Sequence, residues 1–203
     1  MSKHKIFIGS PGSTNDKLSK ANGIAYDSQT NNLYIADTDN QRVMQYQYGA
    51  SMGNVIAGGN GYGLNTSQLS TSYALYFDVF SNSLVIANAD MPRIVRWRIG
   101  DYNGTIVAGS FTGVVGNDAT SLNYPRGVSL DPMGNIYVAD TVNNRIQFFL
   151  SGQTVGRTVA GITGVYGTNM TLLDHPFWVT QDKQLNLYVS DTYNHRVQMF
   201  KRY

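Results

Sequence analysis

The chain has 203 residues, 42% of them hydrophobic, so it is long and apolar enough to bury a substantial core. All thirteen acidic residues are Asp and Gly occurs 21 times, a turn-rich composition that favours an all-β protein over a helical one. The net charge of +2 is too small for a strongly basic nucleic-acid-binding face, and the lack of Cys excludes disulfides and thiolate metal sites.

The N-terminal segment MSKHKIFIGS lacks the long apolar stretch of a signal peptide, and no run of about eighteen apolar residues occurs anywhere in the chain. We therefore expect no membrane association. A cytoplasmic location is the default expectation, unless the chain is a fragment of a secreted protein.

In chain order, one pattern recurs four times. An apolar triplet ending in Gly comes first, then a Gly-rich loop, a Leu, a short strand ending in Asp, and a core such as LYIADTDNQRVMQY. These cores begin at Leu33, Leu84, Ile136 and Leu187. The repeat units span approximately residues 6–54, 55–105, 106–157 and 158–203, which predicts a single repeat domain over residues 1–203.

The third unit shows most clearly how one repeat folds. Its β-rich runs cover residues 105–108, 127–131, 136–139 and 145–150, and turn residues separate the last three. Each unit is thus predicted to form a meander of four short antiparallel strands. The strands are apolar on consecutive positions, which is typical of sheets buried on both faces, so we expect a β-propeller with stacked blades. A β-sandwich does not predict this period, and a β-helix has a shorter repeat.

The run from Pro125 to Phe149, with PRGVSLD, GNIYVADT and NNRIQFF, resembles an NHL repeat. The likeness extends over the whole chain and is weakest in the second unit, where Asn88 and Ala89 replace Asp and Thr. The resemblance implies a propeller whose outermost strand in each blade is the apolar triplet. It implies no single activity, since such propellers serve enzymes, ubiquitin ligases, RNA binders and receptors.

The order of strands predicts how the ring closes. The chain opens with an outer-strand triplet at residues 6–8 and ends with three inner strands, so we expect the N-terminal strand to complete the last blade. NHL propellers usually have six blades. Three arrangements of the four units stay open: a closed monomer, a homodimer that completes a larger ring, or part of a longer propeller.

The repeated Asp and Arg residues are predicted to be structural. Pairs such as Asp37 with Arg42 flank a four-residue turn, where the carboxylate accepts turn N–H groups and the guanidinium bridges to a neighbour. The strand-ending aspartates are expected to cap turns rather than bind calcium. They are Asp27, Asp78, Asp131 and Asp182.

Catalytic chemistry finds little support in the sequence. The three histidines are His4, His175 and His195, and His175 matches one zinc-ligand position of NHL-like amidating lyases. The equivalent positions in the other units are Lys20, Thr71 and Tyr124, which do not rebuild a three-histidine site. We therefore expect no catalytic residues, no metal and no cofactor.

Residues that break the repeat are the best candidates for a specific function. The loops that enter the inner strand and those between the middle strands share one face, and aromatic, Arg and His side chains are typical of interaction hot spots. The candidate residues on this face are Tyr124, Arg126, His175, Phe177, Trp178, Tyr193 and His195. The favoured hypothesis is a non-catalytic propeller that binds a protein or peptide partner. The alternatives are an NHL-like lyase or hydrolase with a metal in the central channel, and an RNA-binding NHL module.

Overall fold

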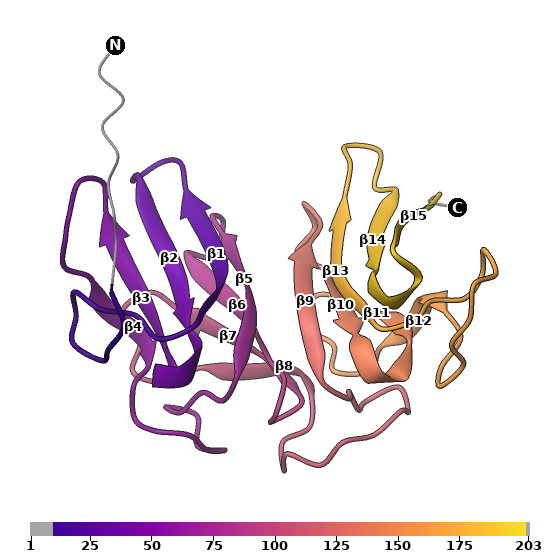
Figure 1. Cartoon of the computed structure of the whole chain (residues 1–203), viewed down its shortest axis with the longest axis horizontal. Helices are drawn as coiled ribbons and strands as arrows, with labels where there is room; N and C mark the ends of the chain where they lie inside the picture. The colour runs from indigo at the N-terminus through magenta and orange to yellow at the C-terminus, as the bar shows by residue number, and fades with distance from the viewer. Residues whose placement is uncertain (1–9, 202–203) are drawn as a thin grey trace.

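The structure is a computed structural model that describes residues 10–201, and in this part of the chain the regular elements are β-strands and three short 3-10 helices. The strands form four separate antiparallel sheets in chain order, which we call blades 1 to 4 (Figure 1). No helix among the described residues is long and apolar enough to cross a membrane.

The elements have the following bounds. Blade 1 contains β1 (Ala21–Asp27), β2 (Asn32–Asp37), β3 (Arg42–Gln47) and β4 (Asn54–Gly58). Blade 2 contains β5 (Ser72–Asp78), β6 (Ser83–Asn88), β7 (Arg93–Arg98) and β8 (Thr105–Gly109). Blade 3 contains β9 (Pro125–Leu130), β10 (Ile136–Asp140), β11 (Arg145–Phe149) and β12 (Arg157–Gly161). Blade 4 contains β13 (Pro176–Gln181), β14 (Leu187–Asp191) and β15 (Arg196–Phe200). The 3-10 helices are η1 (Thr38–Asn40), η2 (Thr141–Asn143) and η3 (Thr192–Asn194).

Each of the first three blades combines three strands of one sequence unit with the apolar triplet of the next unit. Thus β4, which opens the second unit, pairs with β3 of the first. Blade 4 has three strands among the described residues. The strand expected to complete it, residues 6–8, lies outside the described part of the chain.

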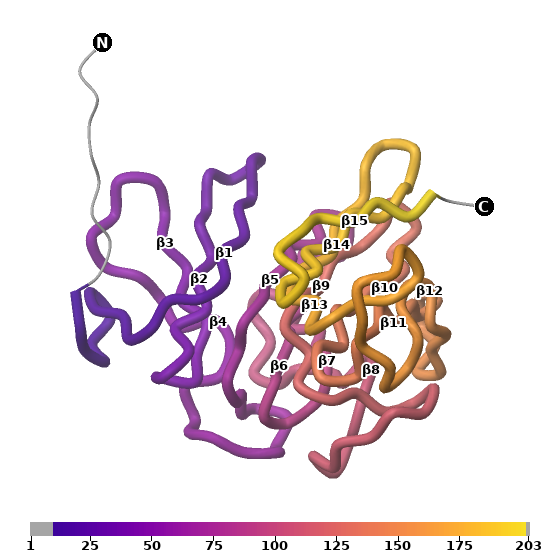
Figure 2. Tube along the Cα trace, turned by 45° about the vertical axis from the view of Figure 1, so that its right-hand side comes forward, coloured from indigo at the N-terminus to yellow at the C-terminus, as the bar shows by residue number. Residues whose placement is uncertain are grey.

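The blades stack through their apolar faces. The inner strands pack in the order β1, β5, β9 and β13, and hydrophobic clusters fill the space between consecutive blades. One cluster joins Val43 of blade 1 to Leu75 and Trp97 of blade 2. The chain is therefore an all-β, four-bladed propeller, as predicted, and Figure 2 shows its trace from a second direction.

Two glycines on inner strands explain how closely the blades approach. A Cβ at Gly23 would lie 2.7 Å from the carbonyl oxygen of Tyr73, and one at Gly127 would lie 2.6 Å from that of Phe177. Both contacts are to backbone of the next blade, which has little freedom to move away. Glycine at this repeat position thus permits direct packing of one inner strand on the next.

The repeated Asp–Arg pairs hold turns and loops together, in agreement with the structural role predicted for them. Arg145 Nε donates to Asp140 Oδ2 at 2.8 Å, and the equivalent bond from Arg42 to Asp37 is 2.7 Å long. The Nη groups of Arg145 donate to backbone carbonyls of the preceding loop, including that of Ser121, and also to Thr163 Oγ1. Each pair therefore ties the entry loop of a blade to the turn between its second and third strands.

The aspartates that end the inner strands also cap turns, as expected. Asp131 accepts hydrogen bonds from the backbone N–H groups of Met133 and Asn135. Asp182 accepts the equivalent bonds from Gln184 and Asn186. Their carboxylates are therefore occupied by the turns that they close.

Candidate functional site

A β-bulge near the start of each inner strand brings one side chain per blade to the same end of the propeller. In blade 3, Asp140 pairs with Pro125 and Ala139 with Gly127, so Arg126 is the extra, unpaired residue. Tyr73 is skipped in the same way in blade 2, and Phe177 in blade 4. Bulges re-aim side chains and are common next to functional sites. Here they place Tyr73, Arg126 and Phe177 on three consecutive blades at one repeat position.

Arg126 lies at the centre of this group. Its guanidinium carbon is 3.9 Å from the centroid of the Phe177 ring, 4.9 Å from that of Tyr73 and 5.2 Å from that of Tyr124. Aromatic faces attract a cation, and the planar guanidinium stacks on them well. We call these four residues, with His175 and Tyr193 beside them, the Arg126 cluster.

No acidic residue neutralises Arg126 within the described chain. Its side chain makes no hydrogen bond and no ion pair with residues 10–201, and its Nε is fully buried without a partner. This sets it apart from Arg42, Arg145 and Arg196, whose Nε atoms each donate to an Asp. The Nη groups of Arg126 are thus the donors left to meet a ligand.

Tyr73 and Tyr124, two of the three tyrosines of the cluster, share one hydrogen bond. Their hydroxyl oxygens lie 3.3 Å apart, and either can be the donor. Because only one of the two protons can lie between them, the other hydroxyl keeps a proton free to donate elsewhere. The bond from Tyr73, together with burial, raises the pKa of Tyr124 to about 12, so this hydroxyl stays protonated at neutral pH.

His175 and Tyr193 form the blade 4 side of the cluster. Their rings stack at 4.2 Å with an angle of 19° between planes, and the Phe177 ring lies 6.2 Å from that of Tyr193. Asp174 Oδ1 lies 2.7 Å from His175 Nδ1 and fixes the orientation of the imidazole. His175 has a left-handed backbone, with φ at 49°, as does Tyr124 at the equivalent position in blade 3.

The structure brings five of the seven predicted residues together. They are Tyr124, Arg126, His175, Phe177 and Tyr193. The other two stay apart from the cluster: Trp178, which is 41% exposed, lies on the face of blade 4 that points away from blade 3, and the exposed His195 side chain makes no hydrogen bond or ring contact with residues 10–201. No three His, Cys, Asp or Glu side chains in this part of the chain gather as a metal site.

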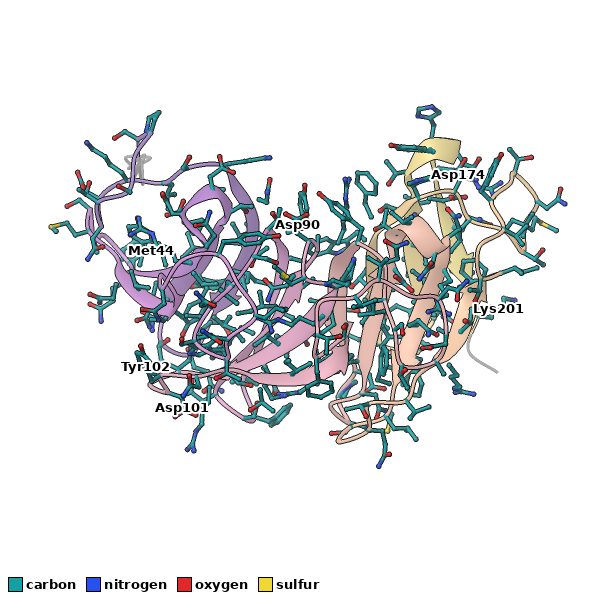
Figure 3. The ribbon with its side chains drawn as sticks, turned by 90° about the horizontal axis from the view of Figure 1, so that it is seen from below. Met44, Asp90, Asp101, Tyr102, Asp174 and Lys201 are labelled. Atoms are coloured by element: carbon teal, nitrogen blue, oxygen red, sulfur yellow. The ribbon has the colours of Figure 1, made fainter. Side chains whose placement is uncertain are left out.

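Sequence reasoning missed Tyr73, Asp174 and Asp90. Tyr73 occupies the same repeat position as Arg126 and Phe177, and this equivalence could have identified it from the sequence. Asp90 lies in the turn between β6 and β7 of blade 2, where Thr71 donates to it, and its charge contributes to the raised pKa of Tyr124. Figure 3 looks onto this end of the propeller, with Asp90 and Asp174 labelled.

A cavity of about 1000 Å³ lies at the opposite end of the inner strands, between blades 2, 3 and 4. Tyr76, Phe77, Val107 and Leu130 line it, so it is largely apolar. Of the two cations in its lining, Arg96 is already paired, with Nη1 2.6 Å from Asp78 Oδ2, and Lys183 is exposed to solvent. The Arg126 cluster, in contrast, offers a partly buried cation without an acidic partner among residues 10–201, and we therefore take it as the candidate site.

Comparison with known proteins identifies the class. The model of the NHL repeat matches residues 18–46 and 122–149, which cover the first and third cores. The chain is 27% identical over 208 residues to the Arabidopsis thaliana protein SUPPRESSOR OF QUENCHING 1, chloroplastic, a match that covers 89% of this chain and 19% of that protein. The first and third units thus match the NHL repeat, and the four stacked blades form a β-propeller.

Solved structures agree with the fold. A protein of unknown function from Bacteroides thetaiotaomicron superposes with a TM-score of 0.72 and 16% identity, over 88% of this chain and 46% of its own. An auxiliary nutrient binding protein from the same organism superposes with a TM-score of 0.67 and 18% identity, over 87% of this chain and 46% of its own. The present chain thus spans less than half the length of each of these matches.

Proposed function

We propose that this propeller is a non-catalytic binding module whose Arg126 cluster captures a carboxylate group of a protein or peptide partner. The observation that carries the proposal is the guanidinium of Arg126, which is stacked among three aromatic rings and has no acidic partner among residues 10–201. The solved structures share only the fold at this level of identity, so the proposal rests on the site itself.

The energetics favour an anionic ligand group. A partly buried guanidinium without an ion pair has lost part of its hydration and has gained only ring contacts in return. A carboxylate binds two guanidinium N–H groups in parallel, and such charged hydrogen bonds are about twice as strong as neutral ones. The free Nη groups of Arg126 present this geometry, and the spare hydroxyl proton of the Tyr73–Tyr124 pair supplies one further donor.

The surroundings favour a peptide over a nucleic acid. Asp90 and Asp174 flank the cluster, and their carboxylates oppose the approach of a polyanionic backbone. The same acids tolerate a single carboxylate that pairs directly with Arg126, and they suit a peptide that carries amide or amine donors beside that carboxylate. The rings of Phe177 and Tyr193 offer apolar surface for an adjacent side chain.

A pair of peptide arrays tests the proposal. One carries random pentapeptides with free C-terminal carboxylates, and the other carries the same peptides amidated, so that internal Asp or Glu supplies the only carboxylates. We expect capture by peptides on one array or both. Arg126→Gln should weaken it about 10- to 100-fold, because the bonds lost involve a charged group. Arg126→Lys should restore only part of the affinity, since a lysine lacks the planar fork.

The matched control is Arg98→Gln, which removes an exposed arginine outside the cluster and should leave capture unchanged. Because Arg126 makes ring contacts but no hydrogen bond to residues 10–201, its variants should stay folded and lower the melting temperature by only a few degrees. Equal capture by wild type and Arg126→Gln would refute the proposal. Salt-sensitive binding of single-stranded RNA, without peptide capture, would replace it with the nucleic-acid alternative.

A further inference from the structure

The cavity at the far end of the inner strands has walls from two consecutive blades in the middle of the chain. Tyr76 and Val107 of blade 2 and Leu130 and Ile136 of blade 3 line it, and all four belong to one hydrophobic cluster that joins these blades. At about 1000 Å³ the cavity has room for a drug-sized molecule, since ligand pockets typically measure about 300–1,000 Å³. It lies at the end of the propeller opposite the Arg126 cluster, so the two sites are separate.

The repeat is altered at the junction between blades 2 and 3. Three blades carry a tyrosine at one position of their second strand, namely Tyr34, Tyr137 and Tyr188. Blade 2 has Val85 at this position. Between blades 1 and 2 the Tyr34 ring stacks on Phe77, with centroids 5.1 Å apart. The equivalent pair between blades 2 and 3 is Val85 and Leu130, so smaller side chains replace both rings of that stack.

Blade 2 carries a tyrosine on its inner strand instead, and its hydroxyl is free. Tyr76 lies opposite Val85 in the strand register, where the other blades have the smaller residues Ala25, Ser129 and Thr180. The Tyr76 hydroxyl makes no hydrogen bond with residues 10–201. Burial, together with the charges of Asp78 and Asp131, raises the pKa of Tyr76, so its hydroxyl stays protonated at neutral pH and can donate to a ligand.

The charged groups around the cavity already have partners or face solvent. Asp78 pairs with Arg96, while Asp131 and Asp182 accept the turn N–H groups described above. Lys183 is exposed. A charged ligand group would therefore enter the cavity without a buried partner, and the three carboxylates oppose an anion in particular. The cavity thus favours an uncharged ligand.

We infer that this cavity binds an uncharged, largely apolar small molecule that contains an aromatic ring and a carbonyl or ether oxygen. The apolar walls bury the ring, much as Phe77 covers the ring of Tyr34 at the first junction. The oxygen accepts the hydrogen bond of the Tyr76 hydroxyl, which fixes how the ring is oriented. A small number of polar groups on apolar walls is the usual arrangement of small-molecule pockets.

Equilibrium dialysis of the whole chain against three naphthalene compounds of similar size tests the inference. They are 2-acetonaphthone, a neutral ketone, 2-ethylnaphthalene, which lacks an acceptor, and 2-naphthoate, an anion. We expect the ketone to bind most tightly. Tyr76→Phe should weaken ketone binding about 3- to 10-fold and leave 2-ethylnaphthalene binding unchanged, because it removes one neutral hydrogen bond. Tyr102→Phe, at a residue 71% exposed and outside the cavity, is the matched control and should change neither.

Two further variants test the space itself. Leu130→Trp enlarges a side chain of the cavity wall, and Val85→Tyr restores the tyrosine of the other blades, so each adds ring atoms at this junction. Each should weaken the binding of both neutral compounds about tenfold or more, because the new ring competes for the same volume, and circular dichroism checks that the variants are folded. Full affinity for the ketone in a folded filled variant, unchanged ketone binding in Tyr76→Phe, or tighter binding of 2-naphthoate than of the ketone would each overturn the inference.

Discussion

Asn88 and Arg93 lie opposite each other across β6 and β7, and each carries a buried side-chain nitrogen, Nδ2 and Nε respectively, with no hydrogen-bond partner among residues 10–201. In the other three blades the residue at the position of Asn88 is an Asp that accepts the bond from the Arg. Asn88 Oδ1 accepts bonds from Ser70 and Ser72, which directs the amide nitrogen away from them. In blade 2 two donors, Asn88 Nδ2 and Arg93 Nε, therefore lie at a position where the other blades pair an Arg donor with an Asp acceptor.

Asn88→Asp should therefore stabilise the protein. The new carboxylate accepts from Arg93 and pairs a guanidinium that is 1% exposed and whose pKa burial lowers. We expect a gain of about 1–3 kcal/mol, since an unsatisfied buried donor is removed. A rise in melting temperature of roughly 2–4 °C per kcal/mol should report it. An unchanged or lower melting temperature would show that desolvation of the new charge outweighs the pairing.

Asp140→Asn makes the opposite change in blade 3. It converts an acceptor of Arg145 into a donor, and it leaves a guanidinium that is 2% exposed without its carboxylate. We expect a loss of about 3–5 kcal/mol, the cost of breaking a buried pair from one side. Chemical denaturation of this variant and of Asn88→Asp, measured together, checks that the free energy of unfolding falls in the first and rises in the second. Equal effects in the two blades would contradict the explanation.

Thr141→Val tests the hydrogen bond between blades 3 and 4. The Thr141 hydroxyl is buried and is a donor to the carbonyl of Pro176, which loses that partner in the variant. We expect a loss of about 1–3 kcal/mol. Thr192→Val is the matched control, because Thr192 bonds within its own blade and the loss should be clearly smaller. Similar losses in the two variants would argue against a role of this bond in blade stacking.

Asp191 should make stability depend on acid pH. Burial acts to raise its pKa, but hydrogen bonds from the Asp174 N–H, Asn194, Arg196 and Gln198 together outweigh burial and lower it below 3.8. A carboxyl with a lowered folded-state pKa contributes stability above its unfolded pKa and loses it as the pH falls through the folded value. Melting temperatures between pH 5 and 2 should therefore fall less steeply for Asp191→Asn than for wild type. A parallel decline in both proteins would exclude Asp191 as a source of the dependence.

Much of the fold follows from the sequence, because one local pattern is repeated. The turn residues at Pro132 to Asn135 and the consecutive apolar positions of residues 136–139 predict strands buried on both faces, and stacked blades satisfy that need. The five-residue spacing of Asp140 and Arg145 predicts a pair across a turn, and the structure has it. Repetition makes each such prediction hold in several blades at once.

The sequence alone also named Arg126, Phe177 and Tyr124 as departures from the repeat. The tertiary structure decided which of them meet. Tyr73, Arg126 and Phe177 are the skipped residues of three β-bulges and lie together, while Trp178, the next residue along, is on the face of blade 4 that points away from blade 3. A bulge shifts by one residue which side chains share a surface, and the packing of neighbouring blades sets the distance between them. The bulge and the packing distance both depend on more than one strand. The sequence therefore determined the blades and the candidate site residues, and only the packing of the blades determined which of those residues form the site.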